Sequence, residues 1–310
     1  MRTYRACPLL ACAAAFALAA CSSAPVAVSD AASRPPKKLT IRELALGAAP
    51  ITLVDGRYEG ENDSAALVPG SELRGDFDGD GRPDAMALVC YDGGGSGPFL
   101  YLAWFPDWRD GKESAATFFL GDRMRVESMS TLADGVSAEL RYVCAGEGDA
   151  LCRPGARGTI RLSLRSGEFV ETYRLEEGRA GIGDLAGRTW GLTNYRVGEK
   201  SVTLDRAAMD RAGDGEAFSL SFEGGLISGA GSCNRFFGTA TDTGPLGLSI
   251  DALGSTKMFC VDEPYGLAEF EYLEALGAVE GWELSLGRLR LHGRRSDGGL
   301  IELSFRTLSP

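Results

Sequence analysis

The segment FSLSFEGGLISG, residues 218–229, shows the alternation on which the fold of the chain depends. Phe218, Leu220 and Phe222 alternate with serines, which predicts a strand with one apolar face. The pair Gly224-Gly225 predicts a turn into a second strand at residues 226–229. The centre of this half of the chain is therefore expected to be antiparallel sheet.

The flanking sequence extends this sheet and adds one helix. Asp262 is a suitable N-cap and Pro264 would fall in the first helical turn, so we predict a helix between Asp262 and Leu276. Its expected apolar stripe is Leu267, Phe270, Leu273 and Leu276. A hairpin at residues 282–286 and 288–292 and a closing strand at 301–305 follow. Strands, one helix and more strands predict a small α+β domain.

The first half of the chain has strand-length runs separated by Gly, Asp and Ser turns. The predicted strands are residues 85–91, 99–105, 138–144, 159–164 and 168–173. Met86, Leu88 and Cys90 share one face, as in a half-buried strand. The glycines of residues 178–183 indicate a boundary. We therefore predict a mainly antiparallel α+β chain with two β-rich domains, residues 40–177 and 183–308.

The N-terminus has the features of a bacterial lipoprotein signal peptide. Arg2 and Arg5 precede an apolar segment at residues 9–20, which is too short to span a bilayer. Leu18-Ala19-Ala20-Cys21 resembles the lipobox, in which the cysteine thiol receives the lipid. We predict a signal peptide at residues 1–20 and a lipidated Cys21 that begins a flexible tether to residue 39. An ordinary secretory leader is the alternative.

Localisation and composition are consistent with this prediction. Ser22 favours the outer over the inner membrane by resemblance to the enteric sorting rule, so we expect an envelope protein facing the periplasm. The net charge is −11, and losing Arg2 and Arg5 with the leader takes it to −13. An acidic surface repels phosphate, so nucleic acid is not expected as a partner.

Five cysteines remain after the leader and the lipid site are set aside. They are Cys90, Cys144, Cys152, Cys233 and Cys260. An oxidising compartment favours disulfides, and we predict pairs Cys144–Cys152 and Cys233–Cys260. Cys90 is interpreted as a buried thiol. The chain has a single histidine and no CxxC, so a zinc site is not expected.

Four blocks stand out in the second half of the chain: LAGRTW at 185–190, FEGGLISG at 222–229, GSCNRFFG at 231–238 and STKMFC at 255–260. In this order they resemble the META domain, an HslJ-like domain of bacterial envelope proteins. Ser232 departs from a glycine that is common in relatives. The resemblance covers about 125 residues and implies an accessory module in stress or antibiotic tolerance, with no shared catalytic chemistry.

The GSCNRFFG block has two interpretations. Cys233, Asn234, Arg235 and Phe236 are candidates for a loop that contacts a partner. The alternative is structural: the Asn234 amide would satisfy loop backbone groups, and Phe236 and Phe237 would supply core or patch area. The expected partners are the membrane, through the lipid on Cys21, and an unknown envelope protein or a small ligand.

An aspartate-rich loop in the first half is the strongest ligand pattern. Its candidate oxygen ligands are the Asp76, Asp78, Asp80 and Asp84 carboxylates and the Arg82 carbonyl. Alternate carboxylates with a glycine turn suit Ca²⁺, although Ala87 stands where an EF-hand has a bidentate glutamate. The alternative is a turn bonded to its own backbone. Calcium is thus a possible ligand, and no cofactor is required. This half resembles an unnamed periplasmic β-rich domain.

Catalytic motifs are missing from the sequence. There is no nucleophile elbow, P-loop or dinucleotide fingerprint, and His292 is expected at the surface. Tyr101, Trp104, Phe105 and Trp108 would form either a platform for a sugar or peptide, or core and strand-end packing. We therefore predict a non-catalytic envelope lipoprotein. The alternatives are a calcium-dependent binding protein and an envelope hydrolase.

Overall fold

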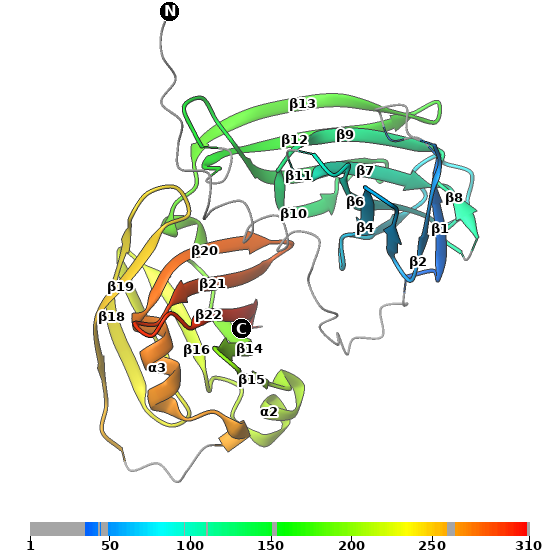
Figure 1. Ribbon diagram of the computed structural model, residues 1–310. Coiled ribbons are helices and arrows are strands. Elements are labelled where there is room, and N and C mark those ends of the chain that lie inside the picture. The colour runs from blue at the N-terminus through cyan, green and yellow to red at the C-terminus, as the bar shows by residue number, and fades with distance from the viewer. Residues whose placement is uncertain are drawn as a thin grey trace, which may run out of the picture. The chain divides into compact units, whose positions relative to one another are not determined.

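The computed structural model describes residues 35–42, 44, 49–95, 97–109, 111–150, 154–258 and 264–308. The predicted signal peptide, Cys21, Cys152 and Cys260 lie outside these residues. The chain divides into two compact units, Met1–Gly178 and Arg179–Pro310, next to the glycine-rich segment 178–183 (Figure 1). Within the described residues, no helix has the length and apolarity needed to cross a membrane.

The first unit is built around a nine-stranded sheet. Its strands are β1 (Lys38–Ile41), β2 (Ile51–Val54), β3 (Arg57–Glu59), β4 (Ser64–Leu67), β5 (Leu73–Gly75), β6 (Asp84–Asp92), β7 (Phe99–Phe105), β8 (Lys112–Glu113) and β9 (Ala116–Asp122). They follow the order β8-β1-β2-β3-β4-β6-β7-β9, with β5 paired to β6. Strand β1 pairs with β8 in parallel and with β2 in antiparallel orientation.

Strands β6 and β7 form the centre of this sheet. The prediction of a half-buried β6 is wrong, because the residues on both faces of the strand are buried. Ala85, Ala87 and Val89 pack into an apolar cluster of the first unit, and Met86, Leu88 and Cys90 are buried on the other face. The aromatic side chains Tyr101, Trp104, Phe105 and Trp108 are also buried, as the core interpretation expected.

A second, four-stranded sheet completes the first unit. Its strands are β10 (Arg125–Thr131), β11 (Ser137–Cys144), β12 (Ala156–Arg165) and β13 (Glu168–Arg179), in that order. The hairpin between β12 and β13 turns through Ser166 and Gly167, which both have positive φ. Strand β13 extends well beyond the predicted residue 173 and is exposed along most of its length.

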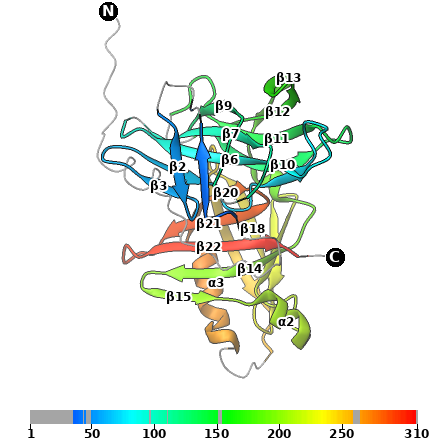
Figure 2. The same cartoon turned by 90° about the vertical axis from the view of Figure 1, so that its right-hand side faces the viewer.

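The second unit contains a second nine-stranded sheet. Its strands are β14 (Trp190–Val197), β15 (Lys200–Thr203), β16 (Ser219–Glu223), β17 (Leu226–Ala230), β18 (Arg235–Asp242), β19 (Leu248–Ser255), β20 (Val279–Ser285), β21 (Arg288–Arg294) and β22 (Leu300–Thr307). The order is β19-β18-β17-β16-β14-β22-β21-β20, with β15 paired to β14. Figure 2 shows β14, β22 and β21 side by side.

The predicted hairpin at residues 218–229 is present in this sheet. Glu223 pairs with Leu226 across the turn, and Gly224 and Gly225 both have positive φ. Such two-residue turns match the twist of paired strands, and glycine adopts them without strain. Leu220, Phe222 and Ile227 are buried on the inner face of the sheet. The mainly antiparallel α+β class is therefore confirmed.

The helices differ from the prediction in three ways. Residues Pro264–Gly266 form a short 3₁₀ turn, and helix α3 (Glu269–Gly277) begins only at Glu269. Phe270, expected in the apolar stripe, is exposed, while Tyr272 is fully buried. A second helix, α2 (Arg206–Ala212), was not predicted. It is capped by Asp205, which accepts a hydrogen bond from Ala208 N at 3.0 Å, and ends at Gly213 with positive φ.

Two of the cysteine predictions are wrong. Cys144 is a free thiol at the end of β11, so it does not pair with Cys152. Cys90, interpreted as a buried thiol, is disulfide-bonded. Cys233 is also disulfide-bonded, while its expected partner Cys260 lies outside the described residues. The Cys233–Cys260 pair therefore stays a prediction.

Candidate functional site

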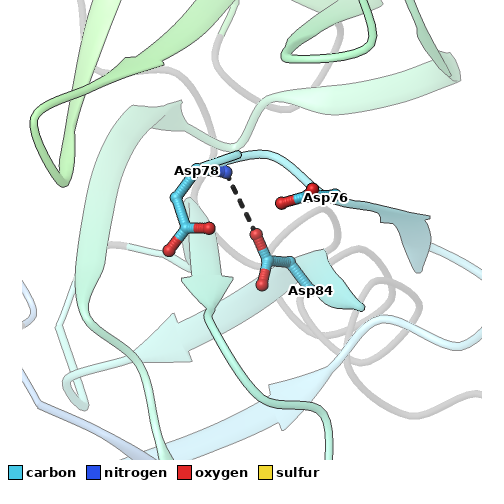
Figure 3. Close-up of side chains that lie close together, drawn as sticks. All are labelled: Asp76, Asp78 and Asp84. Atoms are coloured by element: carbon cyan, nitrogen blue, oxygen red, sulfur yellow. Dashed lines mark hydrogen bonds between the residues drawn. The ribbon is translucent and has the colours of Figure 1, made fainter. Parts of the chain in front are cut away.

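Three aspartates of the predicted cation loop lie together. The loop runs from the end of β5 to the first residue of β6, and one carboxylate oxygen from each of Asp76, Asp78 and Asp84 lies within 4.8 Å of the others. Figure 3 shows the Asp84 side chain projecting from β6 toward the loop that carries Asp76 and Asp78. The two loop residues are exposed and Asp84 is buried.

Asp84 is held at the start of β6 by three hydrogen-bond donors. Its Oδ2 accepts hydrogen bonds from Phe77 N at 2.8 Å, from Asp78 N at 3.2 Å and from Trp104 Nε1 at 3.3 Å. The other oxygen, Oδ1, is buried without a hydrogen-bond partner. Burial raises the pKa of Asp84 despite the hydrogen bonds from Trp104 and Phe77.

The rest of the loop is bonded to its own backbone. Asp76 Oδ2 accepts from Gly81 N at 3.0 Å, and Asp78 Oδ1 accepts from Asp80 N at 3.1 Å. Asp80 accepts from Arg82 N at 2.8 Å and forms an ion pair with the Arg82 guanidinium at 2.9 Å. The loop therefore has the hydrogen bonds of the structural alternative, and Asp80 is not part of the carboxylate group.

The second candidate site, the loop at Cys233 to Phe236, is organised by the Asn234 side chain. Asn234 Oδ1 accepts from Met258 N at 2.7 Å and from the Thr256 hydroxyl at 2.8 Å. Asn234 Nδ2 donates to the Met258 carbonyl at 3.3 Å. The amide thus joins two segments of chain, as the structural interpretation of this residue predicted.

Glu269 supports the same loop from the first residue of α3. Its Oε2 accepts from Asn234 N at 2.9 Å and from Cys233 N at 3.0 Å. A Cβ at Gly231 would lie only 2.4 Å from Glu269 Cγ, so the close approach requires glycine there. Burial opposes the charge of Glu269, but the hydrogen bonds outweigh it and the pKa of this carboxyl is lowered.

The lowered pKa of Glu269 predicts a pH dependence of stability. A carboxyl with a lower pKa in the folded state stabilises the fold above its unfolded value of about 4.3, and that contribution is lost as pH falls through the folded pKa. We expect the melting temperatures of the wild type and Glu269→Gln to differ most at neutral pH and to converge below about pH 4. A difference in melting temperature between the two proteins that stays constant from pH 7 to pH 3 would contradict this role.

The predicted partner loop is mostly buried. Phe236 and Asn234 lie in the core, and Arg235 is exposed and pairs with Glu216 at 2.8 Å. Two exposed apolar residues were not part of the predicted partner loop: Phe237 is 63% exposed and Leu226 is 58% exposed. Neighbouring residues of a strand point to opposite faces, so the Phe236-Phe237 pair signals that one ring is outside.

Comparisons with known proteins agree with this fold. The C-terminal sheet with helices α2 and α3 defines a mainly antiparallel α+β domain, and residues 183–302 match the family model of the META domain. No curated protein matches the chain.

Two solved structures are similar to part of the chain. One is an NMR structure of a protein from Burkholderia xenovorans, with 22% identity and a TM-score of 0.32, covering 42% of this chain and 87% of that one. The other is a DUF4847 family protein from Bacteroides vulgatus, with 18% identity and a TM-score of 0.27, covering 40% of this chain and 96% of that one. At these TM-scores the similarity supports no functional assignment.

Proposed function

We propose that this chain is a non-catalytic lipoprotein of the bacterial cell envelope, in which the META domain serves as an accessory binding module for an envelope protein or small ligand. The match of residues 183–302 to the META domain carries the proposal. The lipobox-like Leu18-Ala19-Ala20-Cys21 supports anchoring by lipid, most consistently in the outer membrane facing the periplasm. A role in stress or antibiotic tolerance is the physiological setting that the resemblance suggests.

One acidic residue of the second unit, Glu271, is poorly placed for general acid catalysis, in keeping with the proposed binding role. A hollow of about 200 Å³ is lined by Tyr195, Glu271, Glu274 and Arg295, among others. Burial opposes the charge of Glu271, but hydrogen bonds from Lys200 and from Ala268 N outweigh it, so the pKa of this carboxyl is lowered. A general acid in a hydrolase needs a raised pKa, so Glu271 is poorly suited to that role.

Lipid attachment can be tested with Cys21→Ser and Cys12→Ser. In bacteria fed an alkyne fatty acid, we expect label on the wild type and on Cys12→Ser and none on Cys21→Ser, because only the thiol that follows the cleavage site accepts diacylglycerol. The mature mass should correspond to a chain beginning at a lipidated Cys21. A cleaved but unlabelled wild type would establish an ordinary secretory leader and refute the anchor.

A further inference from the structure

The carboxylate group at Asp76, Asp78 and Asp84 concentrates negative charge at one end of β6. One oxygen of each lies within 4.8 Å of the others. The nearby cation Arg82 pairs with Asp80, which is outside this group. Like charges at such separations repel, so the arrangement favours either a bound cation or a proton.

A separate observation is the unpartnered oxygen of Asp84. The residue has no exposed surface, and Oδ1 has no hydrogen-bond donor, although Oδ2 accepts three. Buried acceptors are satisfied in the great majority of cases, and each exception calls for an explanation. The three donors fix the Asp84 carboxylate next to the loop that carries the two exposed aspartates, and Oδ2 is the oxygen on the side of that loop (Figure 3).

We propose that Asp76, Asp78 and Asp84 bind one Ca²⁺ ion, with Asp84 as the buried ligand, and that the ion fixes the loop to the start of β6. Ca²⁺ accepts carboxylate oxygens in flexible geometry, whereas Mg²⁺ demands a near-ideal octahedron and retains waters. The glycines at 79 and 81, both with positive φ, let the backbone turn between the ligands. Asp80 is assigned no ligand role. This site does not depend on the lipid anchor.

Trp104 provides a reporter for the ion because its Nε1 donates to the ligand Asp84. In the full mature chain, we expect tryptophan excitation to sensitise Tb³⁺ emission saturably, and Ca²⁺ to displace Tb³⁺ at about 10⁻⁴–10⁻³ M. Trp104→Phe should reduce the emission while calorimetry still detects Ca²⁺ binding. This pair of measurements places the ion beside Trp104.

Two exposed loop residues distinguish this site from a general acidic surface. Asp76→Asn should weaken Ca²⁺ binding at least tenfold, whereas Asp80→Asn should leave the affinity within about twofold. Both residues lie outside the core, so both variants are expected to fold. Calorimetry that finds no Ca²⁺ binding at 10 mM, equal losses in the two variants, or displacement of Tb³⁺ by Mg²⁺ at the same concentration as by Ca²⁺ would overturn the assignment.

Discussion

Glu269→Ala is expected to lower the free energy of unfolding of the second unit by about 2–4 kcal/mol. The truncation leaves two backbone N–H groups, those of Cys233 and Asn234, without the carboxylate that now accepts them at 3.0 and 2.9 Å. Hydrogen bonds to a charged acceptor contribute more than neutral ones, and an unsatisfied donor adds a desolvation cost. The loss should therefore exceed that of an ordinary surface substitution.

The control for this variant is Phe270→Ala, one residue along α3. Phe270 is 68% exposed, so we expect a change within about 0.5 kcal/mol. Glu269→Gln should fall between the two, because it keeps an acceptor and loses the charge. Chemical denaturation of the whole chain gives the free energies, and hydrogen exchange of peptides from residues 231–236 locates the change. Unaltered exchange in Glu269→Ala would refute the supporting role of this carboxylate.

Local patterns predicted much of this structure because their causes are local. The hairpin at residues 218–229 follows from alternation and two glycines, and the group at Asp76, Asp78 and Asp84 from spacing in one loop. The contacts of Glu269 were missed because they join residues that are far apart in sequence. Helix α2 was missed because seven residues give too short a stripe, although its capping residues Asp205 and Gly213 are both visible.

Cysteine pairing also depends on contacts between residues that are far apart in sequence, and the local pattern therefore did not predict it. Cys144 and Cys152 are close in sequence, and proximity suggested a bond that would close a loop. The pairing instead depends on which strands the fold brings together, and Cys144 ends β11 as a free thiol. Cys90 is in the middle of the buried strand β6, where sequence composition gives no sign of a disulfide. Connectivity is a property of tertiary structure, which spacing does not encode.

Cys90→Ala is therefore expected to destabilise the first unit by about 2–5 kcal/mol, the usual cost of removing a native disulfide. Cys144→Ala should change stability much less, because it removes a half-buried thiol and no cross-link. Cys152 is the predicted partner of Cys90, because it is the cysteine of the first unit that remains once the predicted leader, the predicted lipid site at Cys21 and the free Cys144 are set aside. Peptide mapping without reductant should yield a Cys90–Cys152 pair.

Alkylation of the free Cys144 thiol tests independently which cysteines of the first unit are bonded. Burial raises the pKa of Cys144, and a higher pKa leaves less thiolate to react at neutral pH. We expect an alkylating reagent to label the native chain slowly and to label Cys144 alone among residues 90, 144 and 152. If Cys90 is labelled and Cys144 protected, the two thiols have exchanged roles, and the stability ranking of Cys90→Ala and Cys144→Ala should then be reversed as well.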